Sequence, residues 1–297
     1  MHIATKHYIM AIKTIVVLTI LLLLGFSGIT QENLKVMTFN VRYDEALFHK
    51  GESHPNHWAN RKILQVELIN KYQPDVIGMQ EPHLHQIKYL DKQLQAYSWV
   101  GVGRADGKEK DEFNPIYYHS AKLTLMDFGT FWMSETPEEP SRSWDSGYDR
   151  ICTWALFQNM TTKQRFYVFN THFDSKGKIA RLKSAELVNQ KIKIIAGDKP
   201  VFVLGDFNFQ PDSEPYAEIT SKALADSQTI SEKEPAGPEG TFNSFRVGAN
   251  HKRRIDFIFV NKRVKVKNYK VIDFAKNDIY PSDHFPVLIE AKFKKIK

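Results

Sequence analysis

The stretch Val201-Phe202-Val203-Leu204-Gly205-Asp206-Phe207-Asn208-Phe209-Gln210 is the segment from which the fold can best be interpreted. Its first four residues form a short apolar run, which is typical of a strand buried on both faces. Gly205 permits a sharp turn, and Asp206 and Asn208 follow two residues apart, which points an acid and an amide to one side. The stretch alone allows two interpretations: an ordinary turn after a strand, or a polar site at the strand end.

Polar side chains recur at the ends of other predicted strands. The strand predicted at 34–40 ends in Asn40, and the strand predicted at 75–81 ends in Glu81. The strand predicted at 164–170 leads into His172. Each residue also has a purely structural explanation: Asn40 as a turn former, Glu81 as an acid at the start of a helix, and His172 as a surface side chain. One such residue is therefore uninformative, whereas several at strand ends in one chain indicate a site.

The C-terminal part of the chain adds further residues of the same kinds. Asp256 lies within a strand predicted at 253–260, and Asp283 and His284 precede the terminal strand at 287–293. Carboxylates bind Mg²⁺ or Mn²⁺, amides orient phosphate and water, and imidazoles transfer protons near neutral pH. The combination predicts a site for phosphate and a metal ion.

The remaining pattern alternates strands with helices. Helices are predicted at 59–72, with Ile63, Val66 and Ile69 inward, and at 176–196, with an inward face that includes Ile179. The stretch 224–227 is predicted to be a tight segment. The segment 134–148 is rich in Pro, Ser and Glu, and we interpret it as a long surface loop at the substrate rim.

Composition limits the class of protein. The chain has 297 residues, of which 42% are hydrophobic and 25% charged, as in a soluble globular protein. Its single cysteine, Cys152, excludes an intrachain disulfide and a cysteine cluster for zinc, so a metal ion must bind oxygen and imidazole ligands. The net charge of +7 favours an anionic substrate such as a phosphodiester.

The N-terminus predicts export. Lys6 and Lys13 precede the apolar run Ile15–Leu24, and small residues follow. This order is typical of a secretory signal peptide, here residues 1–30, with cleavage after Ser27; a short uncleaved anchor is the alternative. The mature protein is then a single domain, residues 33–297, in the periplasm or outside the cell. There is no cysteine near the cleavage site, so a lipoprotein is not expected.

Taken together, the motifs resemble an ordered set known from one superfamily. They are Thr38-Phe39-Asn40, Gln80-Glu81, Asn170-Thr171-His172, Gly205-Asp206-Phe207-Asn208, Arg254-Ile255-Asp256-Phe257 and Ser282-Asp283-His284-Phe285-Pro286. This set is similar to that of the endonuclease/exonuclease/phosphatase superfamily, and the resemblance covers residues 34–293. It implies an α+β fold: a four-layer α/β/β/α sandwich of two packed, mainly antiparallel sheets flanked by helices.

The resemblance also implies a metal site and a set of catalytic roles. Glu81 is expected to bind Mg²⁺ or Mn²⁺, with Asn40 and Asp283 beside it in contact with metal or phosphate. Asp206 and Asn208 are expected to orient the attacking water and the phosphoryl oxygens.

Four further residues receive roles from the same resemblance. Asp256 is expected to hold His284, which acts as general base or as charge stabiliser. His172 matches the second active-site histidine of the deoxyribonuclease branch, with Glu112 as its acidic partner. Two residues are expected to bind substrate, namely Arg150 and Asn170.

The predicted function is that of an exported, divalent-metal-dependent phosphoester hydrolase of the phosphodiesterase or nuclease type. Its substrate is expected to be a nucleic acid, a phospholipid headgroup, or a sugar or inositol phosphate. The alternatives are a phosphomonoesterase or sphingomyelinase-like enzyme, and a non-catalytic module that binds phosphorylated ligands. The presence of both Glu81 and His284 argues against the last. No obligate protein partner is indicated, and a monomer is expected.

Overall fold

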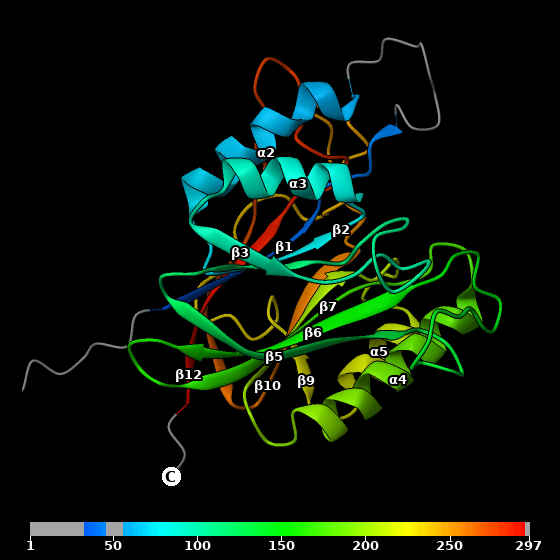
Figure 1. Cartoon of the computed structure of the whole chain (residues 1–297). Helices are drawn as coiled ribbons and strands as arrows, with labels where there is room; N and C mark the ends of the chain where they lie inside the picture. Colours follow the sequence, from blue (N-terminus) through cyan, green and yellow to red (C-terminus); the bar gives the residue numbers. More distant parts are fainter. Residues whose placement is uncertain (1–32, 46–55, 295–297) are drawn as a thin grey trace, which may run out of the picture. The chain divides into compact units, whose positions relative to one another are not determined.

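Two six-stranded β-sheets pack face to face in the computed structural model, which describes residues 33–45 and 56–294 (Figure 1). The predicted signal peptide at 1–30 lies outside the described residues. The first sheet has the order β11-β12-β1-β2-β4-β3. Its strands are β1 (Leu34–Asn40), β2 (Val76–Gln80), β3 (Tyr97–Val100), β4 (Ile116–His119), β11 (Val264–Val271) and β12 (Val287–Phe293).

The second sheet has the order β5-β6-β7-β8-β10-β9. Its strands are β5 (Leu123–Trp132), β6 (Ile151–Asn159), β7 (Arg165–His172), β8 (Val201–Asp206), β9 (Leu224–Asp226) and β10 (Asp256–Asn261). One pair in each sheet is parallel, β1 with β2 and β7 with β8, and the other described pairs are antiparallel.

Helices cover the outer face of each sheet. Helices α2 (Trp58–Tyr72) and α3 (Leu84–Gln93) pack on the first sheet, and α4 (Lys178–Ile195) and α5 (Glu214–Thr220) pack on the second (Figure 1). One apolar cluster fills the space between the sheets, and one lies under each pair of helices. Burial of these three clusters drives assembly of the layers. The predicted four-layer sandwich is confirmed.

The two longest helices face the core differently from the prediction. Ile63 is 57% exposed and Ile179 is 56% exposed, so neither belongs to the inward face. In α2 the polar residues Arg61 and Gln65 are fully buried instead. Both donate hydrogen bonds to the carbonyl oxygens of Val41 and Pro281, at 2.8–2.9 Å. These bonds satisfy carbonyl groups of two buried loops, and this requirement outweighs the apolar pattern of the helix.

Several strand assignments also differ from the prediction, and two of the differences concern the site. The segment 224–226 is a strand, β9, paired with β10. β7 continues to His172, and β10 begins at Asp256, so Asp256 lies at a strand end. In register, Asp206 lies opposite His172 on one side and Asp256 on the other. The topology of the second sheet therefore places an imidazole and a second carboxylate beside Asp206.

Candidate active site

A cavity of about 960 Å³ opens at the edge where these strands end. The predicted residues Glu81, His172, Asp206, Asp283 and His284 line it. All five are largely buried, with 2–6% of their surface exposed. The carboxylate of Glu81 is therefore within the same pocket as Asp206, Asp283 and His284, which the predicted chemistry requires.

Asn40 connects the two sheets at this edge. Its Nδ2 donates to Glu81 Oε1 at 2.8 Å and to Asp206 Oδ2 at 3.1 Å. Its Oδ1 accepts a hydrogen bond from the backbone N–H of Arg42, which fixes the orientation of the amide. The amide nitrogen, which is not a metal ligand, thus faces the carboxylates. Asn40 orients Glu81 and Asp206 in this structure, whereas the prediction gave it contact with metal or phosphate.

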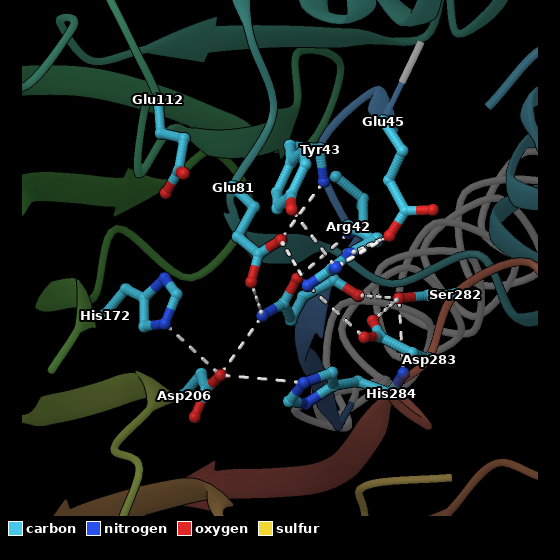
Figure 2. A network of polar contacts seen from close by, with 12 residues as sticks. Arg42, Tyr43, Glu45, Glu81, Glu112, His172, Asp206, Ser282, Asp283 and His284 are labelled. Carbon is cyan, nitrogen blue, oxygen red and sulfur yellow. Dashed lines mark hydrogen bonds and ion pairs between the residues drawn. The ribbon is translucent and has the colours of Figure 1, made fainter. Parts of the chain in front are cut away.

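Arg42 brings positive charge to the same carboxylates. Its guanidinium lies 3.8 Å from Glu81 and 3.5 Å from Asp283 (Figure 2). The backbone N–H of Tyr43 donates to the same oxygen of Glu81, Oε2, at 3.1 Å. Burial opposes the charged form of Glu81, but Arg42, His284 and these hydrogen bonds lower its pKa. The Glu81 carboxylate is therefore held ionised.

Several site residues have left-handed backbone conformations. Arg42 has φ 59°, Glu81 φ 73° and Asn208 φ 51°. Such conformations are unfavourable for residues with a Cβ atom and cluster at functional sites. Each of these residues follows the end of a strand, and the turn redirects its side chain into the cavity.

His284 is held by Asp256, as predicted for this pair. Its Nδ1 lies 2.9 Å from Asp256 Oδ2, and its Nε2 lies 3.7 Å from Asp206 Oδ2. Burial alone lowers the pKa of His284, but the carboxylates of Asp256 and Asp206 more than offset burial and raise it to about 10. The imidazolium form therefore prevails at neutral pH.

His172 has the opposite protonation state. Asn208 Nδ2 donates both to the carbonyl oxygen of Phe173 and to His172 Nε2, each at 3.0 Å. Since this Nε2 accepts, the neutral ring carries its proton on Nδ1. Burial, followed by the charges of Arg150 and Arg104, holds the pKa of His172 well below its usual range. Asp206, 3.4 Å from His172 Nε2, thus lies between a neutral and a charged imidazole (Figure 2).

The donor atoms fit a divalent metal ion. Glu81, His172 and Asp206 each offer one ligand atom, and these atoms lie within 4.8 Å of one another. The carboxylate oxygens of Glu81 and Asp206 suit Mg²⁺ or Mn²⁺, whereas an imidazole suits transition metals, and the lone pair of His172 Nε2 already accepts from Asn208. Asp283, in contact with Arg42, is not part of this group, which therefore differs from the predicted set of Glu81, Asn40 and Asp283.

Glu112 lines the cavity, but the predicted pairing with His172 is not formed. Glu112 Oε2 accepts a hydrogen bond from Arg104 at 2.7 Å and lies 3.8 Å from Arg150. His172 Nδ1 has no hydrogen-bond partner among the described residues, and no dashed line joins the two side chains in Figure 2. The two arginines attract the carboxylate more strongly than a neutral imidazole does.

Arg150 lies in the cavity wall, whereas Asn170 does not. Asn170 is fully buried within β7, and its Nδ2 donates to the carbonyl oxygens of Met79 and Pro115 at 2.7 and 2.9 Å. Gly78 makes room for it, because a Cβ atom there would lie 2.6 Å from Asn170 Oδ1. Asn170 thus links the two sheets and does not line the cavity in which substrate is predicted to bind.

Some residues of the site received no role from the sequence, either because they lie outside the motifs or, for Ser282, because its motif gave it none. Arg42 and Tyr43 follow the strand end, and Ser282 donates from Oγ to the carbonyl oxygen of Asn40 at 2.6 Å. Asp174 accepts hydrogen bonds from the loop before Arg150. Proximity to motif residues was the only signal for these side chains.

The fold and this site define a hydrolase of phosphoric esters. The model of the Endonuclease/Exonuclease/phosphatase family matches residues 37–284, and the chain belongs to this family. Enzymes of the family typically depend on a divalent metal ion, and the donor set described above fits one.

Comparison with individual proteins gives the same family. An endonuclease/exonuclease/phosphatase of Bacteroides vulgatus is 35% identical, with a TM-score of 0.83 over 88% of this chain and 99% of that chain. A mannosyl-6-phosphatase of Bacteroides thetaiotaomicron is also 35% identical, with a TM-score of 0.80 over 88% of this chain and all of that chain. Nocturnin of Drosophila melanogaster is 25% identical over 78% of this chain, which spans only 42% of the length of nocturnin.

Among residues 33–45 and 56–294, no helix is long and apolar enough to cross a membrane.

Proposed function

We propose that the protein is an exported, Mg²⁺- or Mn²⁺-dependent phosphoester hydrolase in which water attacks the phosphorus in line. The observation that carries this proposal is the position of Asp206. Its carboxylate lies within 3.1–3.7 Å of the amide of Asn40 and the imidazoles of His172 and His284. Such a cluster can position a water molecule and stabilise the charge of a phosphoryl group.

The protonation states suggest a division of roles. Burial and the nearby carboxylate of Asp256 raise the pKa of Asp206. With the dication on Glu81 and not on Asp206, this carboxylate can accept a proton near neutral pH. His284, held in the imidazolium form, stabilises negative charge on the phosphoryl oxygens. We therefore assign to His284 the charge-stabilising role, rather than that of general base. Asn208 and His172 orient the water and the phosphoryl group. A bound dication would be held by Glu81 and its neighbours and would supply Lewis-acid stabilisation of the phosphoryl oxygens.

The first substrate class that we propose is a phosphomonoester of a sugar. The support is the likeness to a mannosyl-6-phosphatase, which is 35% identical and is covered along its whole length. A phosphodiester, as in nucleic acid, is the second candidate. It is favoured by the two imidazoles beside Asp206 and by the net charge of +7.

Export remains part of the proposal and depends on the N-terminal sequence pattern. A fusion of residues 1–30 to a reporter that is active only outside the cytoplasm tests it. A cytoplasmic reporter would refute it. Gel filtration at low concentration tests the expected monomer.

Activity should be measured on p-nitrophenyl phosphate and bis-p-nitrophenyl phosphate with Mg²⁺ or Mn²⁺, with and without a chelator. The proposal predicts turnover that the chelator abolishes and the metal restores. Glu81→Gln should reduce kcat by about 100-fold or more, since one metal ligand loses its charge. Phe128→Ala, on an exposed part of β5, is the matched control. Turnover that survives chelation, or wild-type kcat in Glu81→Gln, would refute the metal-dependent mechanism.

A further inference from the structure

The cavity extends beyond the catalytic residues to a second group of side chains. At this end it is lined by Arg104, Asp111, Glu112, Tyr148, Arg150 and Ser175. Motif comparison gave roles there only to Glu112 and Arg150. The others have no place in the reaction described above. We call the group formed by Arg104, Asp111, Glu112, Tyr148 and Arg150 the Tyr148 subsite.

The Tyr148 subsite contains buried groups without partners. Arg150 is only 6% exposed, and its Nε has no hydrogen-bond partner among the described residues. Its nearest carboxylates, Glu112 and Asp174, lie at 3.8 Å, beyond hydrogen-bond distance. The Nδ1 of the neighbouring His172 is also buried and unpartnered. Buried donors of this kind are rare in folded proteins, and a ligand that accepts hydrogen bonds would satisfy them.

An aromatic side chain forms the wall of this end. Tyr148 is 37% exposed and lines the cavity. Three cationic groups surround its ring: the guanidinium groups of Arg104 and Arg150 lie 5.5 and 5.1 Å from the ring centroid, and the ammonium of Lys176 lies at 4.9 Å. The exposed part of the ring offers an apolar surface between hydrogen-bond donors.

Tyr148 is held in place by the backbone around it. Asp174 Oδ2 accepts hydrogen bonds from Ser146 Oγ and from the backbone N–H groups of Gly147 and Tyr148, at 3.0–3.1 Å. Asp145 in the same loop accepts from the backbone N–H of Ala180 at 2.7 Å, at the start of α4. The loop that carries Tyr148 is thus fixed at both the cavity and the helix, as a preformed binding wall requires.

Charge balance indicates what kind of ligand this wall fits. Arg104, Arg150 and Lys176 contribute three positive charges. Asp111 and Asp174 contribute two negative charges, and Glu112, whose burial raises its pKa to about 7, contributes part of a third. A second phosphate or carboxylate would gain little net attraction there. A neutral ring that carries several hydroxyl groups can instead donate to the carboxylates, accept from the cationic groups and contact the Tyr148 ring with its apolar face.

We propose that the Tyr148 subsite binds the sugar ring of a sugar phosphate while its phosphoryl group lies beside Asp206. This inference rests on the proposed phosphomonoesterase function and names the residues that select its leaving group. Tyr148 and Arg104 are then specificity residues, and Arg150 lies between the sugar and the phosphoryl group.

The test compares KM and kcat for a hexose 6-phosphate and for methyl phosphate, which has the same phosphoryl group without the ring. Tyr148→Ala and Tyr148→Leu should raise KM for the hexose 6-phosphate about tenfold, because a stacked ring contributes roughly that factor. Both should leave kcat/KM for methyl phosphate within about twofold of wild type. Tyr148→Phe should resemble wild type, and Phe128→Ala serves as the control for loss of an exposed aromatic side chain.

Two outcomes overturn the inference while the proposed function stands. One is an equal loss for both substrates in the Tyr148 variants, and the other is a wild-type preference for a hexose bisphosphate that depends on Tyr148. If the wild-type enzyme with Mg²⁺ or Mn²⁺ hydrolyses neither substrate but cleaves bis-p-nitrophenyl phosphate, the monoester function itself fails. Far-ultraviolet circular dichroism and thermal melting of each variant separate these outcomes from misfolding.

Discussion

Substitution of Asp256 tests how the site uses its charged imidazole. The His284 Nδ1 to Asp256 Oδ2 contact, at 2.9 Å, joins two side chains that are 5% and 1% exposed. A hydrogen bond between charged groups contributes about 1.5–3 kcal/mol. If the whole bond acts in the transition state, Asp256→Ala should lower kcat by about 10- to 150-fold, at 1.36 kcal/mol for each factor of ten.

Asp256→Asn separates charge from position. Its amide oxygen can still accept from His284, and its nitrogen takes the place of Asp256 Oδ1, which has no hydrogen-bond partner among the described residues. A neutral hydrogen bond is roughly half as strong as a charge-assisted one. The loss of about 1 kcal/mol predicts a decrease of about fivefold in kcat, well below that of Asp256→Ala.

The assay is the pH dependence of kcat together with histidine NMR. The pKa of His284 is raised to about 10, chiefly because Asp256 and then Asp206 offset the effect of burial. In Asp256→Asn the pKa should fall, and the alkaline limb of the pH–rate profile should move to lower pH. The interactions that raise the pKa of His284 also stabilise the fold. This contribution is fully present below the unfolded-state pKa of about 6.5 and is lost as pH rises through the folded-state pKa of about 10. An unchanged alkaline limb, or kcat of Asp256→Ala within threefold of wild type, would refute the role assigned to His284.

Three further predictions concern the scaffold of the site. Arg61→Ala leaves the buried carbonyl oxygens of Val41 and Pro281 with fewer donors and should lower the free energy of unfolding by about 3 kcal/mol in urea titration; a loss below about 1 kcal/mol would contradict this. Gly205→Ala puts a Cβ atom 2.3 Å from the carbonyl oxygen of Thr171, which should cost about 1–3 kcal/mol and lower the melting temperature; an unchanged melting temperature would contradict it. Burial opposes the charged form of Asp174, but hydrogen bonds from backbone N–H groups lower its pKa. The ionised carboxylate therefore stabilises the fold at pH above its usual pKa, and this stabilisation is lost as pH falls through the lowered pKa. The free energy of unfolding of Asp174→Asn should therefore change less with pH in the acid range than that of the wild type. Equal slopes of this free energy against pH would exclude the contribution.

The sequence predicts the convergence of site residues because strand ends are visible in it. Glu81 and Asp206 each follow a short apolar run, and such runs identify buried strands. Asp283 and His284 precede another strand of the same kind. Once the motif order indicates the family, the family topology brings these ends to one edge.

The sequence does not predict which way each side chain faces after the strand ends. Asn170 and His172 are two residues apart in β7 and share one face of the strand, yet the first is enclosed between the sheets and only the second, at the strand end, reaches the cavity. The turn that carries Arg42 depends on a positive φ that no local pattern required. Glu112 meets Arg104 rather than His172 because of a contact between residues eight apart in a loop. Tertiary contacts determine these side-chain positions and partners, and a single sequence does not show such contacts.

The energetic arrangement of the molecule explains why the site lies where it does. Glu81, Asp206 and Asp283 are buried carboxylates at one edge, and their mutual repulsion and desolvation oppose folding. Arg42 and His284 offset only part of this charge. The three apolar clusters lie between and outside the sheets, away from the charged edge, and they stabilise the strands that hold the carboxylates together. A cluster of this composition persists because rigid strand ends impose it, and a bound dication would relieve the repulsion that remains.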